Sequence, residues 1–241
     1  MKWLLPIVLL LGLLGYRANS QVPGIATTLG LATLISGPVA FVNTATNTSH
    51  LSSGSYTSDS LTISGTGCTF LVAWLQGTRS GGAPSAFTGT YNGVSMTVVA
   101  GFPAGPDATF NQEYVTALTL SNPASGSNTL AVNWTGTMNR DTLSAQCFSG
   151  AVGTVSGIVS STSGANLGVS STTVDLVVGT AQSISNGGGI SLTASGGTQD
   201  WNNIVGGPVN VSNSGAHVPG ASSVSFTWSG TKELTAAFSI H

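Results

Sequence analysis

The sequence predicts an all-β protein: a single antiparallel two-sheet β-sandwich, jelly-roll-like, with about ten strands behind an apolar N-terminal segment. From about residue 50 onward, short runs of alternating apolar and polar residues recur every ten residues or so, separated by turn residues. Charged residues number only 12 of 241 (5 Lys or Arg and 7 Asp or Glu), whereas 33 residues are glycine. No long window downstream of the N-terminus shows helical periodicity.

The first twenty residues have the pattern of a secretory signal. Lys2 precedes an apolar run, and small residues occupy positions 18 and 20. We therefore expect residues 1–20 to be a signal peptide or, if retained, an N-terminal hydrophobic anchor. Residues 21–50 form a lead segment with the first strand; the charge-free stretch 24–42 also fits part of an anchor. No charge run or proline-rich linker divides residues 51–241, which we expect to form one β-sandwich domain.

The strands follow from local patterns. Residues 69–75 are apolar on both faces apart from Thr69, which predicts a central, buried strand. Asn92-Gly93 supplies the positive φ angles of a type I′ turn and predicts a hairpin of residues 88–91 and 94–99. The other expected strands are 61–63, 113–120, 129–134, 142–148, 173–179, 189–194, 223–228 and 234–240. The predicted core contains Phe70, Val72, Trp74, Val132, Trp134, Phe226 and Trp228.

Two cysteines, Cys68 and Cys147, allow one disulfide in an exported chain. The alternative is a pair of buried thiols that behave as small hydrophobic groups. Their spacing matches no zinc motif. We predict no cofactor and no metal. The alternative is a single calcium ion at Asp107, in a loop that lacks the repeated acidic residues of a calcium-binding motif.

Few residues are available for catalysis, and we predict that the protein is not an enzyme. The Gly-x-Ser-x-Gly motif is absent, and a hydrolase triad would have to combine His217 with Asp200 and a serine. A glycosidase needs two carboxylates beside the scissile bond. Glu113 and Asp175 lie in or beside predicted strands, where we expect them on the solvent face. The seven candidate acids are Asp59, Asp107, Glu113, Asp141, Asp175, Asp200 and Glu233.

Binding requires fewer groups than catalysis, and one polar segment offers them. Residues 196–203 are expected to form a loop that carries Asp200, Trp201, Asn202 and Asn203. An exposed aromatic ring can cover the apolar face of a sugar while neighbouring amide and carboxylate groups hydrogen-bond to its hydroxyls. The alternative is that Trp201 folds back and caps the end of the sandwich. These four residues are the candidate ligand-binding site, with a cell-surface glycan as the candidate ligand.

Four segments, residues 70–77, 90–97, 145–151 and 236–240, resemble a low-charge β-sandwich module of bacteriophage structural proteins and bacterial secreted proteins. The resemblance spans about residues 60–241 and implies display on a virion or cell surface, with no catalytic residues. Five scattered cations do not form a patch for nucleic acid. Because the sheet edges lack protective charges, they must be covered, closed or paired with neighbouring subunits.

We therefore expect a non-enzymatic structural or adhesive protein displayed on a phage virion or an extracellular bacterial assembly. Its location is extracellular or on the virion surface, and its partners are copies of itself or other surface or virion proteins. A membrane is contacted only through an uncleaved N-terminal segment. The alternatives are a secreted carbohydrate-binding module and, behind it, a secreted glycoside hydrolase or esterase.

Overall fold

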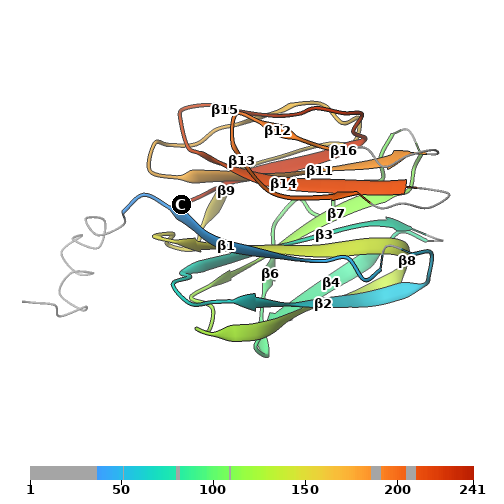
Figure 1. Ribbon diagram of the computed structural model, residues 1–241, viewed down its shortest axis with the longest axis horizontal. Helices are drawn as coiled ribbons and strands as arrows, with labels where there is room; N and C mark the ends of the chain where they lie inside the picture. Colours follow the sequence, from blue (N-terminus) through green and yellow to red (C-terminus); the bar gives the residue numbers. More distant parts are fainter. Residues whose placement is uncertain (1–36, 51, 80–81, 109, 186–190, 205–209) are drawn as a thin grey trace, which may run out of the picture. The chain divides into compact units, whose positions relative to one another are not determined.

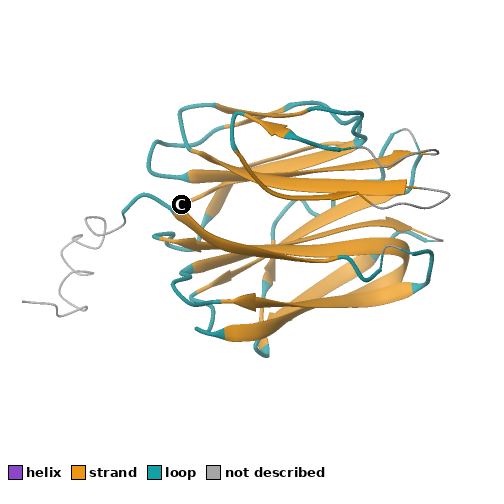
Figure 2. Cartoon of the chain, viewed as in Figure 1, coloured by secondary structure: helices purple, strands orange, loops and turns teal. Residues whose placement is uncertain are grey.

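The computed structural model describes residues 37–50, 52–79, 82–108, 110–185, 191–204 and 210–241. The predicted signal segment, residues 1–20, lies outside the described residues, as do residues 21–36. All regular structure in the described ranges is β-strand, and every strand pair is antiparallel, which confirms the all-β prediction (Figure 2). Within these ranges there is no helix of the length and apolarity needed to cross a membrane.

Sixteen strands form three sheets in the described part of the chain. The eight-stranded sheet contains β1 (Ala40–Asn47), β2 (Tyr56–Ser64), β3 (Phe70–Arg79), β4 (Ser85–Tyr91), β5 (Val94–Ser95), β6 (Thr97–Val98), β7 (Glu113–Ser121) and β8 (Ser127–Ser149). The five-stranded sheet contains β9 (Val155–Ser161), β11 (Leu176–Ser185), β13 (Thr198–Ile204), β14 (Asn210–Pro219) and β16 (Leu234–Ile240). The three-stranded sheet contains β10 (Leu167–Val169), β12 (Ala194–Ser195) and β15 (Val224–Trp228). The prediction of two sheets and about ten strands is therefore wrong.

The 23-residue strand β8 explains part of this difference, because the sequence predicts two separate strands in its place. Its first part pairs with β2 and β4, and its second part pairs with β1 and β3. The change of partners occurs around Gly136, whose φ of +88° is a conformation that residues with a side chain rarely adopt. The chain therefore continues from one layer into the next where the sequence predicts a break between two strands.

Three hydrophobic clusters separate the strands into four layers (Figure 1). One cluster, which includes Leu71 and Leu130, fills the space between the two parts of the eight-stranded sheet. A second joins this sheet to the five-stranded sheet, where Trp74 stacks on Phe238 with ring centroids 5.1 Å apart. A third lies between the five-stranded sheet and the three-stranded sheet that contains β15. Since β3 and β16 have a layer on each side, they are buried on both faces, and all seven predicted core residues are buried.

The predicted hairpin is present, with Asn92 and Gly93 at φ values of 49° and 76° between β4 and β5. The strands that the sequence does not predict, β9, β13 and β14 among them, are rich in serine, asparagine and glycine. Their sequences show little apolar alternation. They form because neighbouring strands satisfy their backbone hydrogen bonds, which a local pattern does not reveal.

The two ends of the described chain meet at one edge of the fold. The amide of Val39 donates to the carbonyl of Val174 (2.9 Å), and the adjacent Asp175 pairs with Nδ1 of His241 (2.9 Å). The strand β1 runs away from this edge, and at about 3.3 Å per residue its far end lies roughly 23 Å away. Near the start of β3, Cys68 and Cys147 form a disulfide with their Cα atoms 5.5 Å apart.

Candidate functional site

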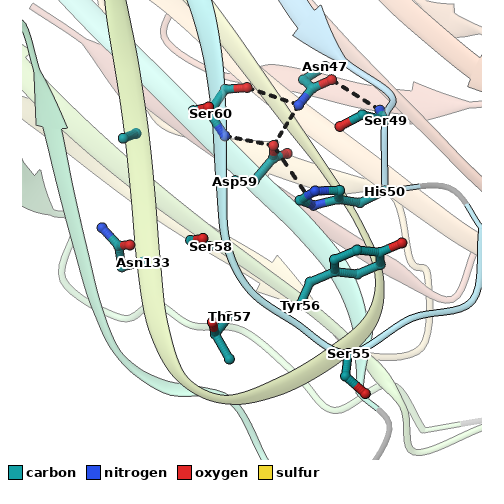
Figure 3. Close-up of a pocket in the computed structure, with 11 residues that line it drawn as sticks. Asn47, Ser49, His50, Ser55, Tyr56, Thr57, Ser58, Asp59, Ser60 and Asn133 are labelled. Atoms are coloured by element: carbon teal, nitrogen blue, oxygen red, sulfur yellow. Dashed lines mark hydrogen bonds and ion pairs between the residues drawn. The ribbon is translucent and has the colours of Figure 1, made fainter.

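An open pocket of about 500 Å³ lies beyond the far end of β1, over β2 and the first part of β8 (Figure 3). Apart from Ala131, every residue that lines it carries a polar side chain. The lining consists of Asn47, Ser49, His50, Ser55, Tyr56, Thr57, Ser58, Asp59, Ser60, Ala131 and Asn133. The pocket therefore presents hydroxyl, amide, imidazole and carboxylate groups to solvent.

A register shift in β2 shapes this pocket. Tyr56 lies opposite Met138 of β8, but Ser58 lies opposite Asn133, so β2 passes over the bend in β8 with an irregular segment. Trp134 holds the irregular segment in place, because its indole Nε1 donates to the carbonyl of Tyr56 (3.1 Å). Bulges of this kind re-aim side chains, and here the shift turns Tyr56 toward His50.

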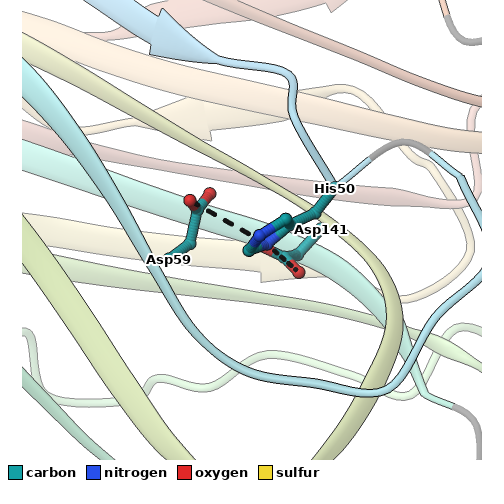
Figure 4. A group of neighbouring side chains, drawn as sticks. All are labelled: His50, Asp59 and Asp141. Carbon is teal, nitrogen blue, oxygen red and sulfur yellow. Dashed lines mark hydrogen bonds and ion pairs between the residues drawn. The ribbon is translucent and has the colours of Figure 1, made fainter.

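Three titratable side chains converge at one side of the pocket (Figure 4). Nδ1 of His50 is 3.1 Å and 3.2 Å from the two carboxylate oxygens of Asp141 and 3.9 Å from Oδ1 of Asp59. One ligand-type atom from each residue lies within 4.8 Å of the other two. The ring of Tyr56 stacks on His50 with centroids 3.9 Å apart, and the Asp141 amide donates to the His50 carbonyl (3.2 Å). The imidazole is therefore held in a fixed position against the two carboxylates.

Both aspartates point inward because they continue the apolar alternation of their strands. Asp59 precedes Leu61 by two residues on β2, and Asp141 precedes Leu143 by two residues on β8, so each carboxylate shares a face with core leucines. The sequence names both aspartates among seven acids but does not pair them, and it gives His50 no role. An acid in phase with an apolar strand face is the signal that identifies this pair.

Burial dominates the electrostatics of the two carboxyl groups, which are 5% (Asp59) and 1% (Asp141) exposed. Burial, followed by the charge of Asp59 and a hydrogen bond to it, raises the pKa of Asp141 to about 9. Burial also raises the pKa of Asp59, and this effect outweighs the lowering by the Ser60 amide and by His50. Two adjacent buried carboxylates repel each other when both are ionised, so the pair retains a proton or binds a cation.

The loop prediction for residues 196–203 is wrong, because Asp200, Trp201, Asn202 and Asn203 all lie in strand β13. Trp201 is 6% exposed and belongs to the second hydrophobic cluster, so its ring does not form a platform for a ligand. Asn202 bonds to Ser191, and Asn203 bonds to Thr46 and Asn213. The side chains of this segment connect strands and layers to one another.

The His217–Asp200 pair is present, with Nδ1 of the histidine 2.8 Å from Oδ1 of the aspartate. The other oxygen of Asp200 accepts from the amide of Gln146, whose own oxygen accepts from the indole of Trp74. The ring of Phe41 covers His217, with centroids 4.5 Å apart. Among the described residues no serine hydroxyl bonds to His217, so this pair belongs to a structural relay between sheets and does not form the triad that we considered.

The acids expected on the surface are also inside. Glu113 is fully buried and Asp175 is 5% exposed, so the solvent-face prediction is wrong for both. The Asp107 carboxylate accepts from the amides of Phe110, Gln112 and Glu113. It caps the turn before β7, so backbone donors occupy the oxygens that a calcium ion would use.

No protein-family model, no curated protein and no solved structure matches the chain. The resemblance of four segments to phage and secreted β-sandwich modules therefore stays a prediction.

Proposed function

We propose that this protein is a non-enzymatic structural or adhesive protein, displayed on a phage virion or an extracellular bacterial assembly, that assembles with copies of itself. One observation carries the proposal: none of the charged residues in the described ranges is exposed. Of the 12 charged residues, Lys2 and Arg17 lie outside these ranges, which leaves ten. Six of the seven acids and Arg140 are buried, and Asp200, Arg79 and Lys232 are intermediate.

The surface consists instead of serine, threonine, asparagine, glycine and scattered apolar side chains. Charge on a protein surface keeps copies apart through mutual repulsion, and a low net charge favours association. Copies of this chain therefore approach one another with little electrostatic opposition. Association that depends on shape, hydrogen bonds and apolar contact should also be nearly insensitive to salt, because few surface charges are screened.

Strand β9 is a suitable contact, since it forms one edge of the five-stranded sheet. It contains no charged residue, and Ile158 on it is 36% exposed; the nearby Val152 is 67% exposed. Natural edge strands usually carry a lysine or a proline that discourages pairing with another chain. At the opposite edge, by contrast, Asn203 of β13 is hydrogen-bonded to Thr46 of β1.

The positions of the chain ends fit display. Val39 and His241 both lie beside Val174 and Asp175, whereas the pocket lies beyond the far end of β1. The first described residues and the pocket therefore lie at opposite ends of β1, an arrangement that suits display of the pocket.

The test is the oligomeric state of the purified full chain by sedimentation velocity over a range of concentrations, at low and high salt. We expect oligomers that grow with concentration and change little with salt. Ile158→Lys should weaken them, whereas Val174→Lys, at an exposed position (54%) outside the strands, should leave them unchanged. A chain that stays monomeric at every concentration would refute self-assembly, and turnover in a glycosidase and esterase screen would refute the non-enzymatic assignment.

Glycan binding is the second candidate function, and the polar pocket favours it over the segment around Trp201. Its hydroxyl and amide groups are those that bind sugar hydroxyls. Retention on a glycan array that Asn133→Ala removes and Asn202→Ala preserves would assign binding to the pocket. Retention that survives Asn133→Ala would exclude the pocket.

A further inference from the structure

The cluster of His50, Asp59 and Asp141 has the dimensions of a metal site. A tetrahedral zinc ion with bonds of about 2.0–2.2 Å to nitrogen and oxygen places its ligand atoms about 3.3–3.6 Å from one another. The imidazole nitrogen lies 3.1 Å from one carboxylate and 3.9 Å from the other, on either side of this value. Shifts of a few tenths of an ångström would bring the imidazole nitrogen to this distance from both carboxylates.

A second observation points to a missing partner. As long as Asp141 is ionised, the buried Oδ2 of Asp59 has no hydrogen-bond donor among the described residues, whereas Oδ1 of the same carboxylate accepts from Asn47 and from the amide of Ser60. Asp59 as a whole is 95% buried, and its carboxylate is turned toward His50 and Asp141 (Figure 4). A buried carboxylate oxygen without a partner is costly. A cation between the three side chains would remove this cost.

We propose that His50, Asp59 and Asp141 bind one divalent transition-metal ion, of which Zn²⁺ is the representative, with a coordination position open to the pocket. An imidazole nitrogen beside two carboxylates suits zinc and its first-row neighbours, whereas calcium and magnesium favour sites made of oxygen alone. Three protein ligands leave a fourth tetrahedral position. Since His50 and Asp59 line the pocket, a water molecule or an oxygen of a bound ligand occupies that position.

The groups behind the ligands are already in place. Asn47 and the Ser60 amide hold Asp59, and the stacked ring of Tyr56 holds His50. The hydrogen bond from the Asp141 amide to the His50 carbonyl fixes these two ligands relative to each other. Such outer contacts orient metal ligands, and their loss typically lowers metal affinity about 10–100-fold.

The alternative to a metal is a proton shared by the two carboxyl groups, and metal titration of the full chain separates the two. The protein is stripped with a chelator, dialysed and titrated with ZnCl₂ and, separately, with CaCl₂; calorimetry and elemental analysis give the stoichiometry. We expect one zinc ion per chain and a melting temperature that rises with zinc and not with calcium. The matched control is His241→Asn, which removes a histidine from another His–Asp pair and should leave zinc binding intact.

Asp141→Asn and His50→Ala should each weaken zinc binding at least about 100-fold. Loss of a group that only orients a metal ligand costs about 10–100-fold, so a larger effect identifies a ligand. Asp141→Asn keeps the shape of the side chain and removes the repulsion within the pair, so this variant should stay folded, as circular dichroism of the metal-free protein verifies. Wild-type protein that binds no zinc would leave the shared proton as the explanation and overturn the proposal. Zinc bound equally well by Asp141→Asn, or a response to calcium alone, would overturn it too.

Discussion

Replacing Trp74 tests whether the eight-stranded and five-stranded sheets pack as described. The side chain is fully buried, its ring lies 5.1 Å from Phe238 and 5.9 Å from Phe102, and its Nε1 donates to Oε1 of Gln146 (3.0 Å). Trp74 therefore contributes apolar packing between the sheets and also the hydrogen bond that begins the relay to Asp200 and His217.

The two contributions differ in size. Trp74→Ala leaves a cavity, which costs about 3–5 kcal/mol in comparable cores. It also leaves Oε1 of Gln146 buried without a donor, which costs about 1–3 kcal/mol. Trp74→Phe retains most of the ring packing and loses the donor, so its cost should be close to the second figure alone. Because a domain is stable by about 5–15 kcal/mol, Trp74→Ala removes a large fraction of the total.

Urea unfolding followed by circular dichroism measures both changes, since the free energy of unfolding falls linearly with urea concentration. We expect Trp74→Ala to be the more destabilising variant by several kcal/mol, with a similar slope in all three proteins. If both variants cost less than about 1 kcal/mol, the ring is not packed between the sheets. Equal and large costs would mean that the hydrogen bond, and not the packing, holds Trp74.

Three further predictions concern stability. Burial, followed by the charges of Glu233 and Asp107, raises the pKa of Glu113 well above its usual 4.5. The folded state therefore keeps a proton that the unfolded state releases, so the free energy of unfolding falls as the pH rises from 4.5 toward the pKa of Glu113 in the folded state. Glu113→Gln should reduce this pH dependence, as urea unfolding at a series of pH values would measure. Replacing Cys68 and Cys147 by serine opens a loop of 79 residues and should cost about 2–4 kcal/mol by thermal unfolding. In Gly215→Ala the new Cβ would lie 2.0 Å from the ring of Trp201, so the melting temperature should drop by several degrees. In the control Gly168→Ala the new Cβ meets no atom within 4 Å, so the melting temperature should stay nearly unchanged.

Each of these predictions has a contradicting outcome. An unchanged pH profile in Glu113→Gln would mean that this carboxyl group is hydrated. A serine double variant as stable under oxidising conditions as wild type would show that the disulfide adds nothing to stability. Equal melting temperatures for the two glycine variants would show that β14 does not press against the tryptophan.

The sequence predicts the parts of the fold that depend on local pattern. Large apolar side chains in phase along a strand identify the core, and Asn92-Gly93 identifies a hairpin, because each signal lies within a few residues. The number of sheets depends on contacts between distant segments, such as the partner change of β8 near Gly136, which has no local signature beyond one glycine. The same holds for the candidate metal site, since His50 and Asp141 are 91 residues apart and meet only through the pairing of the sheets.

The long strand β8 has a consequence for the order in which the chain folds. Contacts such as that between Thr46 and Ser144 join residues 98 positions apart, so β1, β2 and β3 lack their main partner until β8 has been synthesised. Folding dominated by such distant contacts is slow, typically milliseconds to seconds or longer. During that interval three nearly uncharged strands expose their backbone hydrogen-bonding groups, a state prone to pairing with other chains. The concentration of incomplete chains therefore decides how many of them pair with one another before β8 is in place.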